Sequence, residues 1–147
     1  MGEALNQLQI LVIDEDDILL SEVDALSHPS IAFSKLSLGQ VSSSHGPFAD
    51  RDVVIVGVDS SRGLDLLADL CARPGMPPII ALAGRGSHRK SLEHILLLAE
   101  LRGAALALPK PIDGVELALA AIGLVGARSD TFDMSGVAKE LERRLDW

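Results

Sequence analysis

Five short apolar runs alternate with amphipathic segments along this chain, and this alternation restricts the possible folds more than any other feature. The apolar runs cover residues 9–13, 31–38, 53–58, 78–83 and 104–108. Helical spacing of apolar residues follows in residues 17–26, 64–72, 87–102 or 91–102, and 114–124. Strand-length runs that alternate with helices predict an α/β fold with a five-stranded parallel sheet covered on both faces. Apolar and polar residues alternate within 31–38, which indicates a strand near a sheet edge.

Two stretches depart from this alternation. Residues 39–51 are rich in turn formers, so the second helix of the series should be weak or missing. Residues 126–135 have the composition of a linker, and residues 136–147 form a charged amphipathic pattern with Val137, Leu141 and Leu145 on one stripe. We therefore expect a domain over residues 1–125, a linker over 126–135 and an extra C-terminal helix over 136–147.

Charge and cysteine content exclude several function classes. The net charge of −8 argues against nucleic acid or an anionic membrane as the main partner. A single cysteine, Cys71, excludes an internal disulfide, and one thiol is compatible with a reducing compartment. Residues 1–9 lack the pattern of a signal peptide, and the apolar segment 115–127 is too short to span a bilayer. We expect a cytoplasmic protein.

Charged side chains follow the strands, where open α/β sheets usually carry their functional groups. Four acids, residues 14–17, come after the first strand; Asp59 follows the third strand, and Lys110 follows the fifth. The acids and Lys110 should therefore face each other across one crevice. Such acids can bind a hard divalent cation, or they can simply favour the start of a helix through its dipole. Their spacing leaves both interpretations open.

Three segments resemble the receiver domains of bacterial response regulators. They are residues 10–17 (ILVIDEDD), 78–84 (PIIALAG) and 103–111 (GAALALPKP), which occur in the family's order. The resemblance covers residues 9–124. It implies a doubly wound, flavodoxin-like sheet with strand order 2-1-3-4-5. It also implies Mg²⁺-dependent phosphorylation of an aspartate at the end of the third strand.

This chain departs from the family where the phosphorylation chemistry occurs. The acidic pair is retained as Asp14 and Glu15, and the lysine as Lys110. Three functional positions lose their groups: the phosphoacceptor falls at Gly57, the signalling hydroxyl at Ala83 and the switch aromatic at Ala107. We therefore expect no enzyme activity and no cofactor, with at most weak Mg²⁺ binding at Asp14 and Glu15. The resemblance also implies a cis bond before Pro111 and a Lys110 that turns to Asp14, Glu15 or Asp59.

The sequence thus predicts a phosphorylation-independent receiver module that binds a protein in bacterial signal transduction. The expected contact, with a partner or a second copy, is the face formed by the helix ending near residue 102, the fifth strand and the helix that follows. The extra C-terminal helix could dock on this face. Neither nucleic acid nor membrane is an expected partner.

Two alternatives remain open. The loop before Gly63 is shorter than usual, so Asp59 could be a displaced phosphoacceptor that works with Mg²⁺, Asp14, Glu15 and Lys110. Otherwise Asp59 is an ordinary turn or N-cap residue. Residues 98–104 and 108–112 resemble receivers attached to cyclic-di-GMP phosphodiesterase (EAL) domains, so the chain could be the regulatory half of such an enzyme. Residues 84–91 approach a phosphate-binding P-loop, but Arg89 stands where that motif requires glycine.

Overall fold

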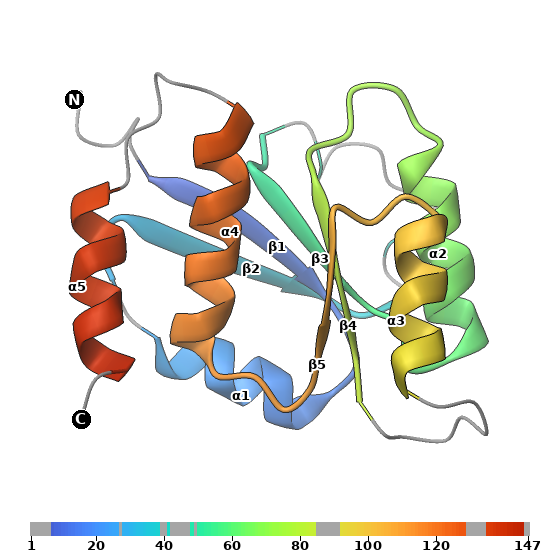
Figure 1. The fold of residues 1–147 in the computed structure, drawn as a ribbon, viewed down its shortest axis with the longest axis horizontal. Helices are drawn as coiled ribbons and strands as arrows, with labels where there is room; N and C mark the ends of the chain where they lie inside the picture. Colours follow the sequence, from blue (N-terminus) through green and yellow to red (C-terminus); the bar gives the residue numbers. More distant parts are fainter. Residues whose placement is uncertain are drawn as a thin grey trace.

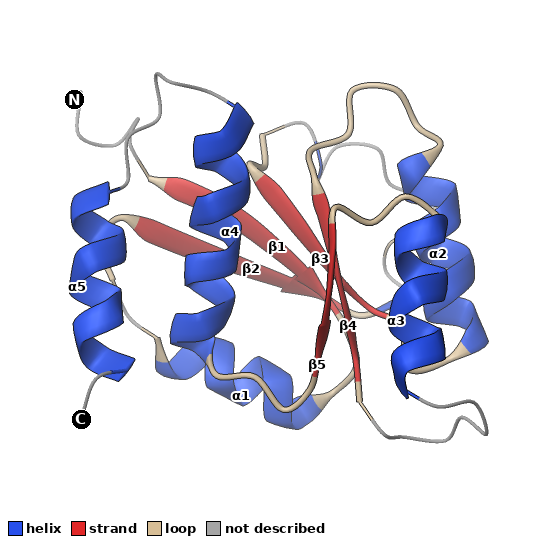
Figure 2. Cartoon of the chain, in the orientation of Figure 1, coloured by secondary structure: helices blue, strands red, loops and turns tan. Residues whose placement is uncertain are grey.

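A computed structural model of the chain describes residues 7–26, 28–38, 41, 48, 50–84, 92–128 and 135–145, with side chains except at 127, 128, 135, 144 and 145. Five parallel strands form one sheet in the order β2-β1-β3-β4-β5 (Figures 1 and 2). The strands are β1 (Leu8–Ile13), β2 (Ile31–Leu36), β3 (Val53–Gly57), β4 (Ile79–Ala83) and β5 (Leu106–Pro109). The predicted fold and strand order are confirmed, and β2 lies at a sheet edge.

Two apolar cores lie on opposite faces of the sheet. Alternate residues of β1, such as Ile10 and Val12, enter the core under α1 (Asp17–Ala25) and α4 (Gly114–Arg128). The residues between them enter the core under α2 (Ser61–Cys71) and α3 (Leu92–Leu101). This division follows from the pleat of a strand, which directs successive side chains to opposite faces. All residues of β3 and β4 are buried because helices cover both faces.

Helix α2 begins at Ser61, three residues before the predicted start at Leu64. Ser60 is its N-cap, and the Ser60 hydroxyl accepts the N–H of Gly63 at 3.3 Å. A hydroxyl in this position satisfies one of the N–H groups that a helix leaves free at its start. Ser60 therefore caps the helix, and Ser61 is its first residue.

Helix α4 ends at Arg128, four residues beyond the predicted end at Leu124, so the predicted start of the linker at Gly126 is wrong. Val125 accounts for the extension because it is buried in the same core as Leu117. Burying a valine side chain contributes about 1.5–3 kcal/mol, which offsets the roughly 1 kcal/mol cost of a helical glycine. Of the rest of the predicted linker, residues 129–134 lie outside the described residues, and Ser135 is the first residue of α5 (Ser135–Leu145). Within the described part, no helix is both long and apolar enough to cross a membrane.

Most of the segment between β2 and β3, on which the prediction of a weak or missing helix falls, also lies outside the described residues. Two described residues there, Val41 and Phe48, are buried in the core under α2 and α3. The P-loop-like residues 85–91 between β4 and α3 are outside the description as well.

The C-terminal helix α5 (Ser135–Leu145) packs against α4. Leu141 is fully buried, and Val137 packs beside it against the core. Glu140 Oε1 lies 2.6 Å from Nε2 of His28, which precedes β2. Figure 1 shows α5 on the side of α4 that faces away from α3 and β5. Within one chain, α5 therefore docks on α4 away from α3 and β5, which differs from the predicted docking within the chain.

Candidate functional site

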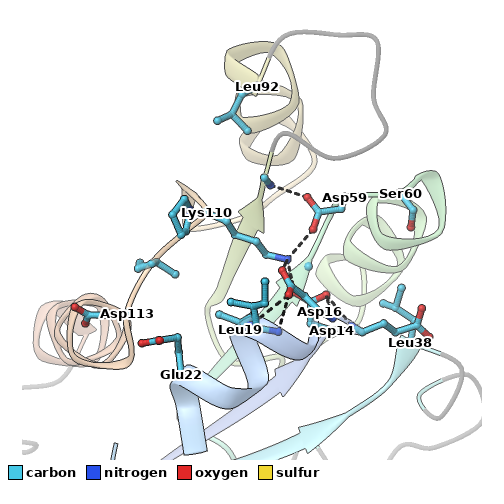
Figure 3. Close-up of a pocket in the computed structure, with 16 residues that line it drawn as sticks. Asp14, Asp16, Leu19, Glu22, Leu38, Asp59, Ser60, Leu92, Lys110 and Asp113 are labelled. Carbon is cyan, nitrogen blue, oxygen red and sulfur yellow. Dashed lines mark hydrogen bonds and ion pairs between the residues drawn. The ribbon is translucent and has the colours of Figure 1, made fainter. Parts of the chain in front are cut away.

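The carboxyl ends of β1, β3, β4 and β5 surround a cavity of about 1000 Å³ (Figure 3). Among the described residues, its lining contains one cation, Lys110. The acids that line it are Asp14, Glu15, Asp16, Glu22, Asp59 and Asp113. The predicted crevice between the acids after β1 and the lysine after β5 is therefore present.

Asp14, directly after β1, is a buried charged residue with only 6% of its surface exposed. Its Oδ1 accepts the backbone N–H groups of Glu15 at 2.7 Å and Asp16 at 3.2 Å. Its Oδ2 lies 2.8 Å from Lys110 Nζ in an ion pair. Asp14 is thus held by the turn that follows β1 and by the lysine that follows β5.

Gly57, the last residue of β3, lies directly beneath the Asp14 carboxylate. A Cβ atom built on Gly57 would overlap the carboxylate carbon and both oxygens of Asp14. A second glycine, Gly63 in the first turn of α2, approaches the same strand end, and a Cβ there would overlap the carbonyl oxygen of Gly57. The space that a side chain at position 57 would need is therefore filled by Asp14.

Lys110 joins three carboxylates. Its Nζ lies 2.6 Å from Asp59 Oδ2, 2.8 Å from Asp14 Oδ2 and 3.0 Å from Asp16 Oδ2, and its side chain is 8% exposed. Burial by itself would lower the pKa of Lys110. The contacts with the three carboxylates outweigh burial and raise this pKa above its ordinary value of 10.5, so the amine remains charged.

Asp16, one of the four acids that follow the first strand, also belongs to this cluster. It is the N-cap of α1, and its Oδ1 accepts the N–H groups of Ile18 at 3.0 Å and Leu19 at 3.3 Å. Its Oδ2 accepts from Lys110. Burial by itself would raise the pKa of Asp16, but the Lys110 bond and these backbone N–H groups lower it below 3.8. An acid immediately before a helical pattern is the signal that could have identified this cap.

Asp59 connects the ends of three strands. It follows β3, its Oδ1 accepts the N–H of Gly84 after β4 at 2.6 Å, and its Oδ2 accepts from Lys110 after β5 at 2.6 Å (Figure 3). Its side chain is 32% exposed. Asp59 is not the N-cap of α2, because Ser60 has that position. Both carboxylate oxygens are therefore engaged within the protein.

The other predicted positions lie as follows. Glu15 is exposed and lines the cavity, but it is not among the carboxylates that contact Lys110. Ala83 is completely buried in the core under α2 and α3, and Ala107 packs partly buried against the same core. The bond between Lys110 and Pro111 is cis, as predicted. Lys110 turns to Asp14 and Asp59, also as predicted, with Asp16 as an unexpected third partner.

The residues present do not fit the divalent cation that the resemblance implies. Position 57 offers no carboxylate, and Asp14 already accepts two N–H groups and contacts an ammonium group. No three His, Cys, Asp or Glu side chains in the described part of the chain are arranged to hold a metal ion. The point at which three carboxylates converge is the position of Lys110 Nζ.

Comparisons with known proteins identify the fold. Neither a scan against protein-family models nor a search of curated proteins found a match. The receiver domain of the Francisella response regulator 1452 matches with a TM-score of 0.63 and 19% identity, over 84% of this chain and 100% of that chain. A Burkholderia pseudomallei response regulator with a phosphorylated aspartic acid, a calcium ion and citrate matches with a TM-score of 0.58 and 19% identity, over 82% and 70% of the two chains.

A longer protein, NtrX from Brucella abortus, matches over 92% of this chain and 30% of its own length, with a TM-score of 0.63 and 21% identity. At these low sequence identities, the three proteins share a fold with this chain, and a shared fold does not by itself imply a shared function. This chain has the fold of the receiver domains of response regulators.

Proposed function

We propose that the chain is a receiver-like module of bacterial signal transduction that binds a protein partner without being phosphorylated and without acting as an enzyme. One observation carries the proposal: the Asp14 carboxylate fills the space above Gly57, the position of the phosphoacceptor in the resemblance. No carboxylate extends from that strand position toward the cavity. The module would then bind its partner through a surface of constant shape, and the concentration of the partner would determine how much complex forms.

Asp59 is the residue that an alternative, phosphorylatable receiver would use. Its two oxygens each accept a 2.6 Å hydrogen bond, one of them from a charged ammonium group. Charge-assisted hydrogen bonds of this length hold the carboxylate strongly and reduce its nucleophilicity. This arrangement favours a structural role for Asp59.

An exposed apolar pair on α3 supports the interaction role. Leu97 is 54% exposed and Leu101 is 74% exposed, and they lie one helical turn apart. Other apolar residues of the predicted face, Ile95, Leu117 and Ile122, are buried and belong to the cores. The proposed contact therefore centres on Leu97 and Leu101, beside the edge strand β5.

Phosphorylation is tested on the wild-type chain with acetyl phosphate and Mg²⁺, followed by intact-mass spectrometry. We expect no change in mass. Asp59→Asn serves as the control for any adduct that forms. A phosphoryl adduct on the wild type that is absent from Asp59→Asn would refute phosphorylation independence.

The interaction surface is tested with the double variant Leu97→Glu/Leu101→Glu. Light scattering and partner capture should show loss of the dimer or complex, while circular dichroism shows an unchanged fold. Ile18→Glu is a matched control, because Ile18 is 74% exposed at the mouth of the cavity rather than on the α3 face. A wild type that remains monomeric, with a double variant that retains every partner, would exclude this surface.

A further inference from the structure

We propose that the Lys110 ammonium group takes the place of a divalent cation in this pocket, so that the chain holds its three converging carboxylates together without a metal ion. The inference rests on the proposed function, since a pocket that receives no phosphoryl group has no need of an exchangeable cation. It goes further because it identifies a side chain of the protein, Lys110, as the cation that the carboxylates surround.

Three carboxylate oxygens surround Nζ. Its three oxygen neighbours come from different places: Asp14 from the end of β1, Asp16 from the cap of α1 and Asp59 from the β3–α2 turn. They lie at 2.6–3.0 Å. Calcium binds oxygen at about 2.3–2.6 Å and magnesium at about 2.0–2.1 Å. A calcium ion at this point would require the carboxylates to close by a few tenths of an ångström, and a magnesium ion would require more.

The charges explain why the cluster needs a cation. Three carboxylates face one ammonium group, which leaves the cluster with an excess of negative charge even when Lys110 is present. Without a cation, these closely spaced carboxylates, of which Asp14 is buried, would have to take up protons or move apart. Lys110 is tethered to β5, and its attachment gives it an effective concentration that a free ion does not have. The ammonium group is therefore a permanent occupant.

Asp59 links the Lys110 ammonium group to the ends of the neighbouring strands. The carboxylate that Lys110 holds also accepts the N–H of Gly84, so a single side chain links the ends of β3, β4 and β5. Magnesium and phosphoryl donors would then leave the conformation of these strand ends unchanged. The module would present the same surface under all these conditions.

The test compares calcium and magnesium binding by the wild type and by Lys110→Met, in which an apolar side chain of similar length replaces the ammonium. The wild-type Tm should shift by less than about 1 °C in 10 mM CaCl2 or MgCl2, while Lys110→Met should gain roughly 3 °C or more in calcium. Magnesium should have the smaller effect. Isothermal titration should show calcium binding that weakens at least tenfold when Asp14→Asn is added.

Lys35→Met is the matched control, since Lys35 also binds a carboxylate at 2.6 Å, that of Asp24, but on the surface and with no second acid among the described residues. It should acquire no calcium response. Lys110→Gln replaces the methionine variant if that protein is too unstable to purify. The proposal would be overturned if the wild type bound either metal tightly and Asp14→Asn abolished that binding. It would also be overturned if a folded Lys110 variant showed no calcium binding and no increase in Tm in calcium. A phosphoryl adduct detected by intact-mass spectrometry would refute the proposed function, and that measurement is independent of these metal titrations.

Discussion

Replacing Gly57 with alanine tests directly whether the Asp14 carboxylate occupies the position of the missing side chain. Alanine usually stabilises a strand relative to glycine, by about 0.5–1 kcal/mol, because glycine loses more backbone freedom on folding. Here the new methyl group would overlap the Asp14 carboxylate, which must move. Gly57→Ala should therefore be destabilising although it enlarges the side chain by only one carbon.

The cost follows from the contacts that Asp14 would lose. Its Oδ1 accepts two backbone N–H groups, at 2.7 and 3.2 Å, and hydrogen bonds to charged groups contribute about 1.5–3 kcal/mol each. Its ion pair with Lys110 would also weaken, although Lys110 keeps Asp16 and Asp59. Losing the shorter hydrogen bond and part of the ion pair gives about 3–4 kcal/mol. After the intrinsic gain of alanine, the net loss should be about 2–3 kcal/mol.

Urea unfolding at neutral pH, followed by circular dichroism, measures this difference in the free energy of unfolding. Gly123→Ala is the control, because Gly123 lies in α4 with open space around it and should gain about 0.5–1 kcal/mol. In an Asp14→Ala background the cost of Gly57→Ala should disappear, which gives a coupling energy of about 3 kcal/mol in the double-mutant cycle. A Gly57→Ala protein as stable as the wild type, or equally destabilised in both backgrounds, would refute the placement of Asp14.

Three further predictions concern the cluster and its surroundings. The folded-state pKa of Asp16 is lowered, so ionised Asp16 stabilises the fold above pH 3.8, and this stabilisation is lost as the pH falls through the folded-state pKa. The free energy of unfolding should therefore fall less steeply with decreasing pH in Asp16→Asn than in the wild type. Leu141→Ala should cost about 2–5 kcal/mol in urea unfolding, whereas Glu140→Gln should cost less than about 1 kcal/mol, because Leu141 is fully buried and Glu140 is half exposed. Gly63→Ala should destabilise the chain by about 2 kcal/mol or more, because its Cβ would overlap backbone; an unchanged denaturation midpoint would contradict this close approach.

Much of the fold could be predicted because its signals are local. Short apolar runs such as residues 53–58 can be buried on both sides only in a covered parallel sheet. Element ends were less predictable, since they depend on tertiary contacts. The end of α4 is set by the core around Val125, although Gly123 and Gly126 weaken the local helical signal. The position of α5 depends on contacts that are distant in sequence: Leu141 is buried in the core that β1 and α4 share, and Glu140 contacts His28.

The site was predicted in part for a similar reason. Asp14, Asp59 and Lys110 could be identified because each directly follows a strand, and parallel strand ends meet at one edge. Asp16 was expected in the crevice with the other acids after β1 but was not singled out as a partner of Lys110, because an acid that caps a helix and an acid that faces a pocket have the same sequence pattern. Only the structure shows that one carboxylate serves both, with Oδ1 on the helix and Oδ2 on Lys110. Glu15 was assigned to the pocket by resemblance, and its carboxylate is not a partner of Lys110.

The departures around position 57 are connected physically. Without a side chain at Gly57, the Asp14 carboxylate can turn inward over the strand end, where Lys110 reaches it. Without a side chain at Gly63, the first turn of α2 can approach the Gly57 carbonyl closely. The short β3–α2 turn that this approach permits holds Asp59 where it reaches both Lys110 and Gly84. Restoring an aspartate at position 57 alone would therefore place a second carboxylate where Asp14 already lies, and the two like charges would repel each other. A phosphoacceptor in this pocket would require Asp14 and the start of α2 to move as well, so no single substitution should restore one.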